Sequence, residues 1–293
     1  MMGMQRGMDA CMDRESEGGM PALERRRFLR LNGKGSEPAE GFVVVEEPLQ
    51  IQLNGRPVAV LMRTPGQEKE LAVGYCVTEG LVTSFEAIGL VQHCGGSAPA
   101  AGTFSDPLDI SRNIVNITTL DGQVSDRPPE VMRLVRSGCG RADPGEVAEQ
   151  LTPLENALQV PAEVIRRLAR SLAEGQRAYR EAGGVHAVAI FDAAGNLVAL
   201  SEDVGRHNAI DKAIGYCLLR RIPLHDKILY STGRASYEMV TKAVRVGLPV
   251  AISRSSATTL AIDLAERLNC TLVGYARAGR MTIYTHAWRV VMG

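Results

Sequence analysis

The sequence predicts an α/β protein in which strands and helices alternate through the C-terminal half. From Gly183 onward, short apolar stretches such as KILYS and PVAIS are separated by amphipathic stretches such as SYEMVTKAVRVG. This alternation is typical of a largely parallel sheet with helices on its faces. The preceding residues mix hairpin, strand and helix patterns, which predicts a smaller α+β part before the main sheet.

The N-terminal part is predicted to hold a hairpin, a helix and a further strand. The stretch LQIQLNGRPVAVLM places apolar residues on both sides of Asn54-Gly55, which is a strong hairpin signal. The stretch TPGQEKELAVGYCVTEG predicts a helix, with Pro65 near its start and Gly80 just after its end. Residues 110–120 are predicted to form another strand.

Four segments are predicted along the chain. Residues 1–40 begin with a stretch rich in Met, Gly and charge that lacks the apolar run of a secretory signal, and they are predicted to be a disordered leader. Residues 41–130 are the α+β subdomain, and residues 151–293 are the α/β domain. Residues 131–150 are predicted to be a mobile loop, because neither helical nor strand periodicity fits RLVRSGCGRADPG.

Local signals mark the elements of the α/β domain. Pro161 stands in the first turn of the helix PAEVIRRLARSLAEG, and VHAVAIFDAAGNLVALSED predicts a hairpin with its turn at residues 192–195. Asn208 is predicted to cap a helix, and Gly247 to end another. The helix TTLAIDLAERL has five residues predicted to face inward: Leu260, Ala261, Leu264, Ala265 and Leu268. The stretches TLVGYA and MTIYT predict the last strands.

The composition argues against several classes of protein. The chain has 33 Lys and Arg against 33 Asp and Glu, so its net charge predicts no general affinity for nucleic acid or a membrane surface. No apolar run is long enough to cross a bilayer. Together with the missing secretory signal, these features predict a cytoplasmic protein with no nucleic-acid or membrane partner.

The 6 cysteines form no C-x-x-C pair and no zinc-finger spacing. In a reducing compartment they are predicted to be free thiols. Cys76, Cys217 and Cys270 lie in or beside apolar patterns and are predicted to be buried. Cys94 and Cys139 stand in loop-like stretches, and only their surroundings suit chemistry.

Turns after the predicted strands of the α/β domain carry arginine. The turns are EDVGRHN after LVALS, TGRAS after KILYS, RSSATT after PVAIS and RAGR after TLVGYA. In open α/β sheets such turns line one crevice, and helix N-termini there suit phosphate. The pattern predicts a crevice for a polyanion such as a nucleotide, held by Arg206, Arg234, Arg254, Arg277 and Arg280. The alternative is that these arginines are solvated surface groups in weak ion pairs.

The stretch EDVGRHNAIDKA allows two interpretations. Glu202, Asp203 and His207 are candidate acid/base groups, or they form a polar network that holds the turn. The structural or ligand-orienting role is favoured. His186 begins an apolar strand and is predicted to be a core histidine.

Other catalytic motifs are missing. The stretch GGVHAVA has Val188 where a zinc deaminase needs Glu, and no P-C-x-x-C follows, so no metal site is predicted. The sequence has neither a G-x-S-x-G elbow nor a Walker lysine motif, which argues against a serine hydrolase and a P-loop ATPase.

The stretches MRTPGQEKELAVGYCVTEGL, EDVGRHNAIDKAIG, YSTGRASYEMVTKA and ISRSSATTLAIDLAERLNCTLVGYARAGRMTIYT together resemble the formate dehydrogenase accessory family, FdhD. The resemblance implies a cytidine-deaminase-like α/β fold without zinc in the C-terminal half, and a homodimer. It implies a sulfurtransferase-type carrier that takes persulfide sulfur from a cysteine desulfurase. The sulfur would pass to the molybdenum (or tungsten) cofactor, bis-molybdopterin guanine dinucleotide, before its insertion into the formate dehydrogenase catalytic subunit.

The resemblance also implies two sets of site residues. The family's sulfur-bearing cysteine lies in a loop between the two halves, where this chain has Cys139. The family's cofactor-binding stretch matches YARAGR, whose residues are Tyr275, Ala276, Arg277, Ala278, Gly279 and Arg280. Arg254 is expected to grip the same guanine dinucleotide, for which GDP is a mimic. Asp203 and His207 are expected to shape the rim of that pocket.

The cysteine loop departs from the family pattern, because most relatives have C-x-x-C there and this chain has Cys139 alone. Arg136 and Arg141 are expected to stabilise its thiolate. A second thiol would help to release the sulfur by forming a disulfide. Without it, release needs another reductant, Cys94, or the partner subunit's Cys139. Two other functions stay open: a cofactor-binding chaperone without sulfur transfer, and a nucleotide hydrolase.

Overall fold

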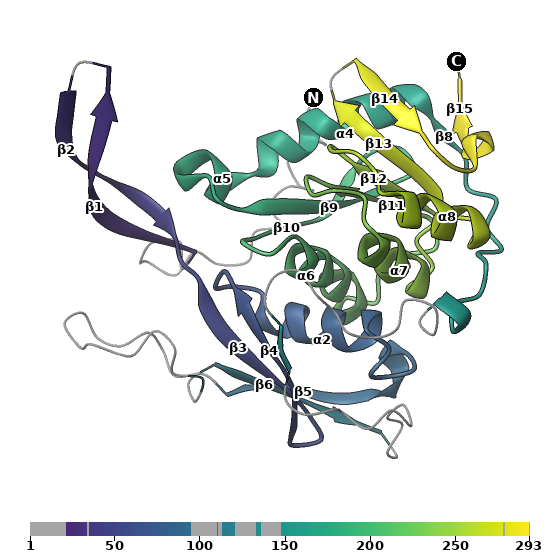
Figure 1. Cartoon of the computed structure of the whole chain (residues 1–293). Helices are drawn as coiled ribbons and strands as arrows, with labels where there is room; N and C mark the ends of the chain where they lie inside the picture. Colours follow the sequence, from purple (N-terminus) through teal and green to yellow (C-terminus); the bar gives the residue numbers. More distant parts are fainter. Residues whose placement is uncertain are drawn as a thin grey trace, which may run out of the picture.

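The computed structural model describes residues 22–33, 35–94, 110, 113–120, 148–277 and 279–292, and the backbone of residues 133–135. This part of the chain forms two subdomains and a projecting hairpin (Figure 1). Among the described residues, no helix has the length and apolar character needed to cross a membrane.

The C-terminal subdomain contains a six-stranded sheet with the order β10-β9-β11-β12-β13-β14. Its strands are β9 (His186–Asp192), β10 (Leu197–Asp203), β11 (Lys227–Ser231), β12 (Val250–Ser253), β13 (Thr271–Arg277) and β14 (Arg280–Ile283). The pairs β11–β12 and β12–β13 are parallel, and the other three pairs are antiparallel. The predicted α/β class is therefore confirmed. The sheet is less parallel than expected because tight turns join β9 to β10 and β13 to β14, and such turns require antiparallel pairing.

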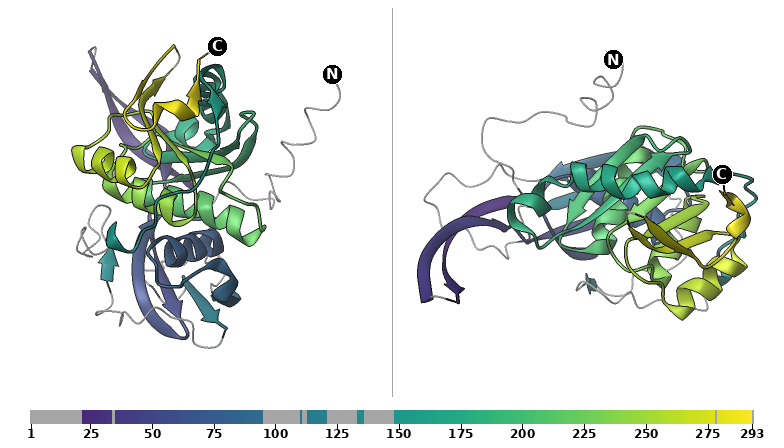
Figure 2. Two further views of the ribbon diagram at one scale, coloured as in Figure 1. Left: turned by 90° about the vertical axis from the view of Figure 1, so that its right-hand side faces the viewer. Right: turned by 90° about the horizontal axis from the view of Figure 1, so that it is seen from above.

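Helices cover both faces of this sheet (Figures 1 and 2). They are α4 (Ala162–Gly175), followed by the short α5 (Arg177–Ala182), and α6 (Arg206–Leu219), α7 (Tyr237–Arg245) and α8 (Thr259–Arg267). Alternate residues of β9 point to opposite faces. Ala187, Ala189 and Phe191 therefore share a core with α4, whereas Val188 and Ile190 share one with α6, α7 and α8. Near the end of the chain, the 3-10 turn η3 (Ala287–Arg289) leads into β15 (Val290–Val291), which pairs in parallel with β8 (Val160–Pro161).

The N-terminal subdomain is a five-stranded sheet with the order β5-β6-β3-β4-β7, covered by α2 (Glu68–Thr78). Its strands are β3 (Glu47–Leu53), β4 (Arg56–Arg63), β5 (Ile88–Cys94), β6 (Ile114–Thr119) and β7 (Arg133–Val135), and the 3-10 turn η1 (Phe85–Ala87) precedes β5. The predicted hairpin at Asn54-Gly55 is confirmed. Both residues have positive φ, 53° and 76°, as a type I′ turn requires. The predicted helix and third strand are present as α2 and β6, and β7 adds a strand inside the predicted loop 131–150.

α2 and α6 join the two subdomains with their backbones in contact. A Cβ on Gly74 would lie 1.9 Å from the carbonyl oxygen of Asp211, and a Cβ on Gly215 would lie 1.9 Å from that of Glu70. Only glycine allows this approach. The contact holds the C-terminal end of α2 beside the polar residues of α6.

Residues 23–44, here called the arm, form a long hairpin that projects from the body (Figures 1 and 2). β1 (Leu23–Asn32) pairs with β2 (Gly35–Val44) in antiparallel register. The prediction of a disordered leader is therefore wrong for residues 22–40, and residues 1–21 lie outside the described chain. Arg27 faces Glu40 and Arg30 faces Glu37 across the strands, and such pairs stabilise a hairpin. A charge-rich composition does not distinguish this arrangement from a disordered segment.

Two predictions of local detail are wrong. α6 begins at Arg206 with Gly205 as its N-cap, so Asn208 is not the cap. The Asn208 side-chain amide instead donates to the Met62 carbonyl oxygen (2.8 Å) and to the Asp203 carboxylate (3.0 Å). Leu260 is 48% exposed on α8, whereas the other four residues predicted to face inward are buried.

Candidate functional site

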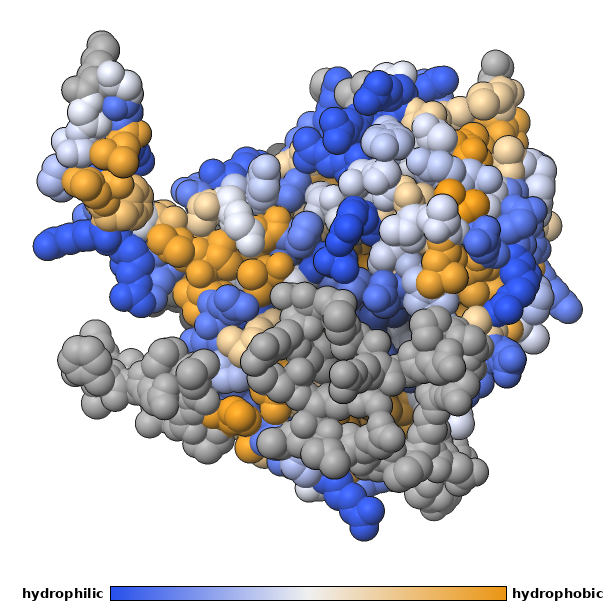
Figure 3. Space-filling view, in the orientation of Figure 1, coloured by the Kyte–Doolittle hydropathy of each residue, from blue (hydrophilic) through white to orange (hydrophobic). Residues whose placement is uncertain are grey.

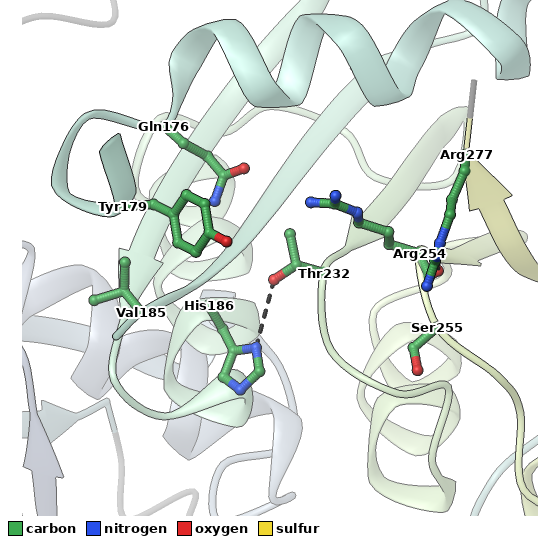
Figure 4. Close-up of a pocket in the computed structure, with 8 residues that line it drawn as sticks. All are labelled: Gln176, Tyr179, Val185, His186, Thr232, Arg254, Ser255 and Arg277. Atoms are coloured by element: carbon green, nitrogen blue, oxygen red, sulfur yellow. Dashed lines mark hydrogen bonds between the residues drawn. The ribbon is translucent and has the colours of Figure 1, made fainter. Parts of the chain in front are cut away.

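A pocket of about 360 Å³ lies at the edge of the C-terminal sheet where β11 and β12 end (Figure 4). Its lining residues are Gln176, Tyr179, Val185, His186, Thr232, Arg254, Ser255 and Arg277. The turns after β11 and β12 and the end of β13 supply one wall. The junction of α4 and α5 supplies the opposite wall. His186 reaches the same edge because β9 starts there and runs antiparallel to β11.

A distortion of β13 places its last residues at this edge. The register with β14 shifts between Gly274 and Arg277, and Tyr275 has a positive φ of 50°. The Tyr275 N–H leaves the sheet and donates to the Ser255 carbonyl oxygen at 2.8 Å. The Arg277 Nε–H then donates to the Arg254 carbonyl oxygen at 3.3 Å. The two arginine-bearing segments are therefore tied to each other.

A tyrosine below the pocket supports this distortion. Tyr230 is fully buried on β11, and its hydroxyl donates to the Ala276 carbonyl oxygen. Burial raises the pKa of Tyr230 to about 12. The phenol therefore stays protonated and keeps its role as a donor.

The opposite wall is held by Glu202 on β10. Its carboxylate accepts the backbone N–H groups of Arg177, Ala178 and Tyr179 at 2.8, 2.9 and 3.0 Å. These first N–H groups of α5 have no partner within the helix. Glu202, a candidate acid/base group in the sequence, therefore fixes the position of the α4–α5 junction.

His186 lines the pocket rather than the core in which it was predicted. Thr232 Oγ1 accepts the Ala187 N–H at 2.9 Å and lies 3.5 Å from His186 Nδ1. This contact holds the imidazole ring at the pocket wall. Burial, and then the charge of Arg206, lower the pKa of His186, so its ring is neutral at neutral pH.

The pocket is cationic and has no internal counter-charge. None of its lining residues is a carboxylate. Within the described chain, Arg254 and Arg277 are exposed and neither forms an ion pair with Asp or Glu. Two guanidinium groups beside an imidazole N–H and a hydroxyl suit a ligand that carries phosphate or pyrophosphate.

The YARAGR stretch is divided by the structure. Arg277 and Arg254 both line the pocket, and Arg280 does not. A second hollow of about 360 Å³ is lined by Arg166, Gly279, Arg280, Met281, Ile283 and Met292. Tyr275 is 39% exposed and lines neither hollow, and Ala276 is buried. Ala278 lies outside the described residues. Of the other predicted arginines, Arg234 is exposed and Arg206 is half-buried, and neither lines the pocket.

Asp203 lies in the core rather than at the pocket rim. It is 0% exposed, and its carboxylate forms an ion pair with Lys212 Nζ at 2.7 Å. It also accepts the N–H groups of Thr64 (3.1 Å) and Gly205 (2.8 Å). Because Thr64 belongs to the N-terminal subdomain, this network joins the two subdomains. The network interpretation of EDVGRHN therefore describes Asp203 better than a place at the rim.

A second buried ionic cluster lies between α2, α6 and α7. Lys242 Nζ donates to Thr78 Oγ1 at 2.8 Å, to Glu79 Oε1 at 2.7 Å and to both Asp211 carboxylate oxygens at 2.9 Å. Thr78 Oγ1 also donates to Asp211 at 2.7 Å. Burial raises the pKa of Asp211 to about 6, whereas the pKa of Lys242 is raised by its carboxylate partners despite burial.

His207 stands beside this cluster and outside the pocket. Burial, and then the charges of Lys242 and Arg206, lower the pKa of His207 to about 4. Its Nε2 lies 3.9 Å from the Glu238 carboxylate. His207 is therefore a neutral residue at neutral pH, placed next to α7 and not at the rim where it was expected.

The described cysteines divide as the sequence predicts. Cys76, Cys217 and Cys270 are buried, and Cys94 at the end of β5 is exposed. Burial raises the pKa of Cys76, and that of Cys270 to about 12. These thiols stay protonated and are poor nucleophiles. Cys139, the predicted sulfur-bearing residue, lies outside the described residues.

Sequence reasoning missed several residues of the pocket: Gln176, Tyr179, Thr232, Ser255 and His186. Two of them had a usable signal, because Thr232 and Ser255 stand in the turns that follow β11 and β12. Gln176 and Tyr179 had none. Their segment precedes β9 in the chain, and only the packing of α5 brings them to the pocket.

The fold and the pocket define the class of this protein: a two-subdomain α/β protein with a cationic pocket at the edge of its main sheet. The described residues contain no group of His, Cys, Asp and Glu that could hold a metal ion. The model of the FdhD/NarQ family matches residues 44–291. The chain belongs to the FdhD/NarQ family, which confirms the resemblance found in the sequence.

Curated relatives match nearly the whole chain. The sulfur carrier protein FdhD of Mycolicibacterium paratuberculosis is 35% identical over 285 residues, which cover 92% of this chain and 100% of that protein. Proteins of the same name from Mycobacterium tuberculosis and Saccharolobus solfataricus are 36% and 35% identical, and the alignments cover 92% and 90% of this chain and 99% and 98% of theirs.

A solved structure has the same fold. The crystal structure of a candidate formate dehydrogenase accessory protein from Desulfotalea psychrophila is 25% identical in sequence and has a TM-score of 0.75. The match covers 92% of this chain and 100% of that one. The likeness extends to both subdomains. The cytidine-deaminase-like detail of the fold stays a prediction.

Proposed function

We propose that this protein is a sulfur carrier that supplies persulfide sulfur to bis-molybdopterin guanine dinucleotide for a formate dehydrogenase catalytic subunit. Similar proteins are named as a sulfur carrier and as a formate dehydrogenase accessory protein, and these names support this role. The observation that carries it is the pocket where Arg254 and Arg277 meet without a carboxylate. Guanidinium pairs of this kind suit the pyrophosphate groups of that cofactor.

The proposed sulfur-bearing residue is Cys139. Its thiolate attacks the outer sulfur of a persulfide on a cysteine desulfurase. A new S–S bond forms on Cys139 while the S–S bond of the desulfurase breaks, and the desulfurase cysteine leaves as a thiolate. The exchange needs no external oxidant. The buried thiols of Cys76, Cys217 and Cys270 are not accessible for this step.

Mass spectrometry after incubation with a cysteine desulfurase and cysteine tests the carrier role. We expect an added sulfur mass on the Cys139 peptide of the wild type and none in Cys139→Ala. Cys94→Ala, which alters the exposed thiol on β5, should keep the adduct. No adduct, under conditions that charge a relative with C-x-x-C, would favour the alternative of a cofactor-binding chaperone without sulfur transfer.

A nucleotide hydrolase is the less favoured function. None of the residues that line the pocket has a carboxylate to act as a general base. Incubation with GDP followed by chromatography should show bound nucleotide and no GMP. Steady release of GMP by the wild type would contradict the carrier proposal for this pocket.

The proposal includes a homodimer, and we place its contact on the arm. Large apolar side chains are exposed there: Phe28, Leu29, Leu31, Phe42 and Val43. Figure 3 shows apolar surface on the arm and at its base. A two-stranded hairpin is marginally stable alone in water, so a second copy packed on the arm would stabilise it. Light scattering should give a dimer for the wild type and a monomer for Leu29→Lys/Leu31→Lys. A variant that stays dimeric would show that the arm is not the dimer contact.

A further inference from the structure

A bulge in β13 decides which face of the strand carries Arg277. In a regular strand alternate residues share a face, so Val273, Tyr275 and Arg277 would lie on the same side. In the structure, Val273 and Ala276 share the core beneath α4 instead. The extra residue falls where the register with β14 shifts, between Gly274 and Arg277. The bulge therefore keeps Arg277 out of that core and at the pocket.

The bulge carries backbone strain. Tyr275 has a φ of 50°, in the left-handed region that a bulky residue rarely adopts. Such a conformation persists only where the surrounding structure fixes it. Two hydrogen bonds to other segments do so: the Tyr275 N–H donates to the Ser255 carbonyl oxygen at 2.8 Å, and the Tyr230 hydroxyl donates to the Ala276 carbonyl oxygen. Of these two bonds, the second depends on a side chain and can be removed by substitution.

The Tyr230 hydroxyl acts directly on the backbone of Arg277. The Ala276 carbonyl oxygen belongs to the peptide bond that precedes Arg277, and a peptide unit is planar. A bond to this oxygen therefore fixes the Arg277 amide nitrogen as well. Burial raises the pKa of Tyr230, and the charges of Arg254 and Arg277 oppose this rise, so both guanidinium groups lie near the phenol. Tyr230 itself is fully buried and does not line the pocket.

We propose that Tyr230 is a positioning residue for the anion that binds in this pocket. Its hydroxyl holds the β13 bulge, and the bulge directs the Arg277 side chain toward the phosphate groups beside Arg254. Donors that are already in place bind more tightly, because less ordering is needed when the ligand arrives. This inference rests on the proposed function, in which the ligand carries pyrophosphate, and it adds a residue that acts without touching the ligand.

Isothermal titration calorimetry of the full chain with inorganic pyrophosphate tests the proposal. Tyr230→Phe keeps the packed ring and removes only the hydroxyl, so pyrophosphate affinity should fall about three- to tenfold, as for the loss of one hydrogen bond. Tyr284→Phe is the matched control, because the Tyr284 ring lies beside Gly274 and its hydroxyl forms no hydrogen bond with any described residue. This control should bind pyrophosphate like the wild type. Unchanged affinity in Tyr230→Phe would overturn the proposal.

A double-mutant cycle tests whether Tyr230 acts through the bulge. Glycine adopts a positive φ without strain, so Tyr275→Gly should keep the bulge without the Tyr230 hydroxyl. In the Tyr275→Gly background, Tyr230→Phe should therefore change pyrophosphate affinity by less than about twofold. An equal loss of affinity in the two backgrounds would overturn the proposal, because Tyr230 would then act by another route.

A spectroscopic readout needs no ligand. The Arg277 Nε–H donates to the Arg254 carbonyl oxygen at 3.3 Å, and its signal in proton–nitrogen NMR spectra is identified by its loss in Arg277→Gln. This signal should shift in Tyr230→Phe and stay in place in Tyr284→Phe. A signal that does not move in Tyr230→Phe would overturn the positioning role. If the signal moved but the wild type bound no pyrophosphate, the proposed function would fail and the positioning of Arg277 by Tyr230 would stand.

Discussion

Positively charged side chains have carboxylate partners at the interface between the subdomains and none in the pocket. At the interface, Lys212 and Lys242 are buried and lie 2.7 to 2.9 Å from the carboxylates of Asp203 and Asp211. At the pocket, the Arg254 and Arg277 side chains form no ion pair with any described carboxylate. A buried cation needs an internal partner, whereas an exposed cation stays solvated by water until a ligand binds. A positively charged side chain is therefore structural where its counter-charge lies inside the protein, and available to a ligand where it does not.

The largest effect is expected where the interface loses its cation. Lys242→Met would leave the Asp211 and Glu79 carboxylates together without a positive charge, which should cost about 3–5 kcal/mol of unfolding free energy. Urea unfolding followed by circular dichroism measures it. Lys69→Met, at an exposed position of α2, is the matched control and should change stability by less than about 0.5 kcal/mol. Equal losses in the two variants would remove the contrast between interface and surface.

A smaller loss of stability is expected when the contact between α2 and α6 at the same interface is disturbed. In Gly215→Ala the new Cβ would lie 1.9 Å from the Glu70 carbonyl oxygen, a backbone atom, so the helices must separate. Overpacking of this kind costs about 1–3 kcal/mol. Gly33→Ala is the control, because no atom lies within 4 Å of its added Cβ. Thermal unfolding of both variants checks the difference, and an unchanged midpoint for Gly215→Ala would contradict it.

At the pocket, the change should appear in binding and not in stability. Arg277→Gln removes a charge-assisted contact to phosphate, so GDP affinity should fall about 10- to 100-fold. The unfolding free energy should change by less than about 0.5 kcal/mol, because Arg277 has no internal counter-charge. Arg170→Gln, exposed on α4, is the control for calorimetry and denaturation. If Arg277→Gln lowered the stability and left GDP binding unchanged, Arg277 would have a structural role instead.

The smallest effect concerns pH and sharpens the description of the interface. The pKa of His207 is about 4, below its ordinary 6.5, so between these values the unfolded chain binds a proton that the native chain does not. The stability that His207 contributes is therefore lost as pH falls from 6.5 to 4. Asp211, with its pKa raised from 3.8 to about 6, has the opposite dependence. The difference in unfolding free energy between the wild type and His207→Gln should therefore decrease as the pH falls from 6.5 to 4. A difference that does not vary with pH would contradict the burial of His207.

Short-range signals in the sequence predicted most elements of the fold. The Asn54-Gly55 turn, the amphipathic stripe of α4 and the strands around Gly247 all appear where turn chemistry and periodicity place them. The arm was missed because its strands pair only with each other and stay exposed, so no apolar alternation marks a buried face. The distortion at Tyr275 was missed because it depends on hydrogen bonds from other strands.

The sequence predicted the arginine side of the pocket and missed the opposite wall. Arg254 follows β12 and Arg277 ends β13, and the parallel pairing of these strands brings the two residues to the same edge of the sheet. Gln176 and Tyr179 come from a helix junction earlier in the chain, and Glu202 holds them there through contacts that no local pattern shows. Arg280 was expected in the same crevice, but the β13–β14 turn carries it to the second hollow.

The sequence by itself determined the α/β class, the FdhD resemblance and the turns that carry arginine, because periodicity and turn chemistry act over a few residues. The tertiary structure alone decided which charges are neutralised and which face the pocket. Lys242 meets Glu79 across 163 residues of sequence, and Asp203 meets the Thr64 backbone across 139. Electrostatic partners are set by distance in space, and that distance depends on how α2, α6 and α7 pack.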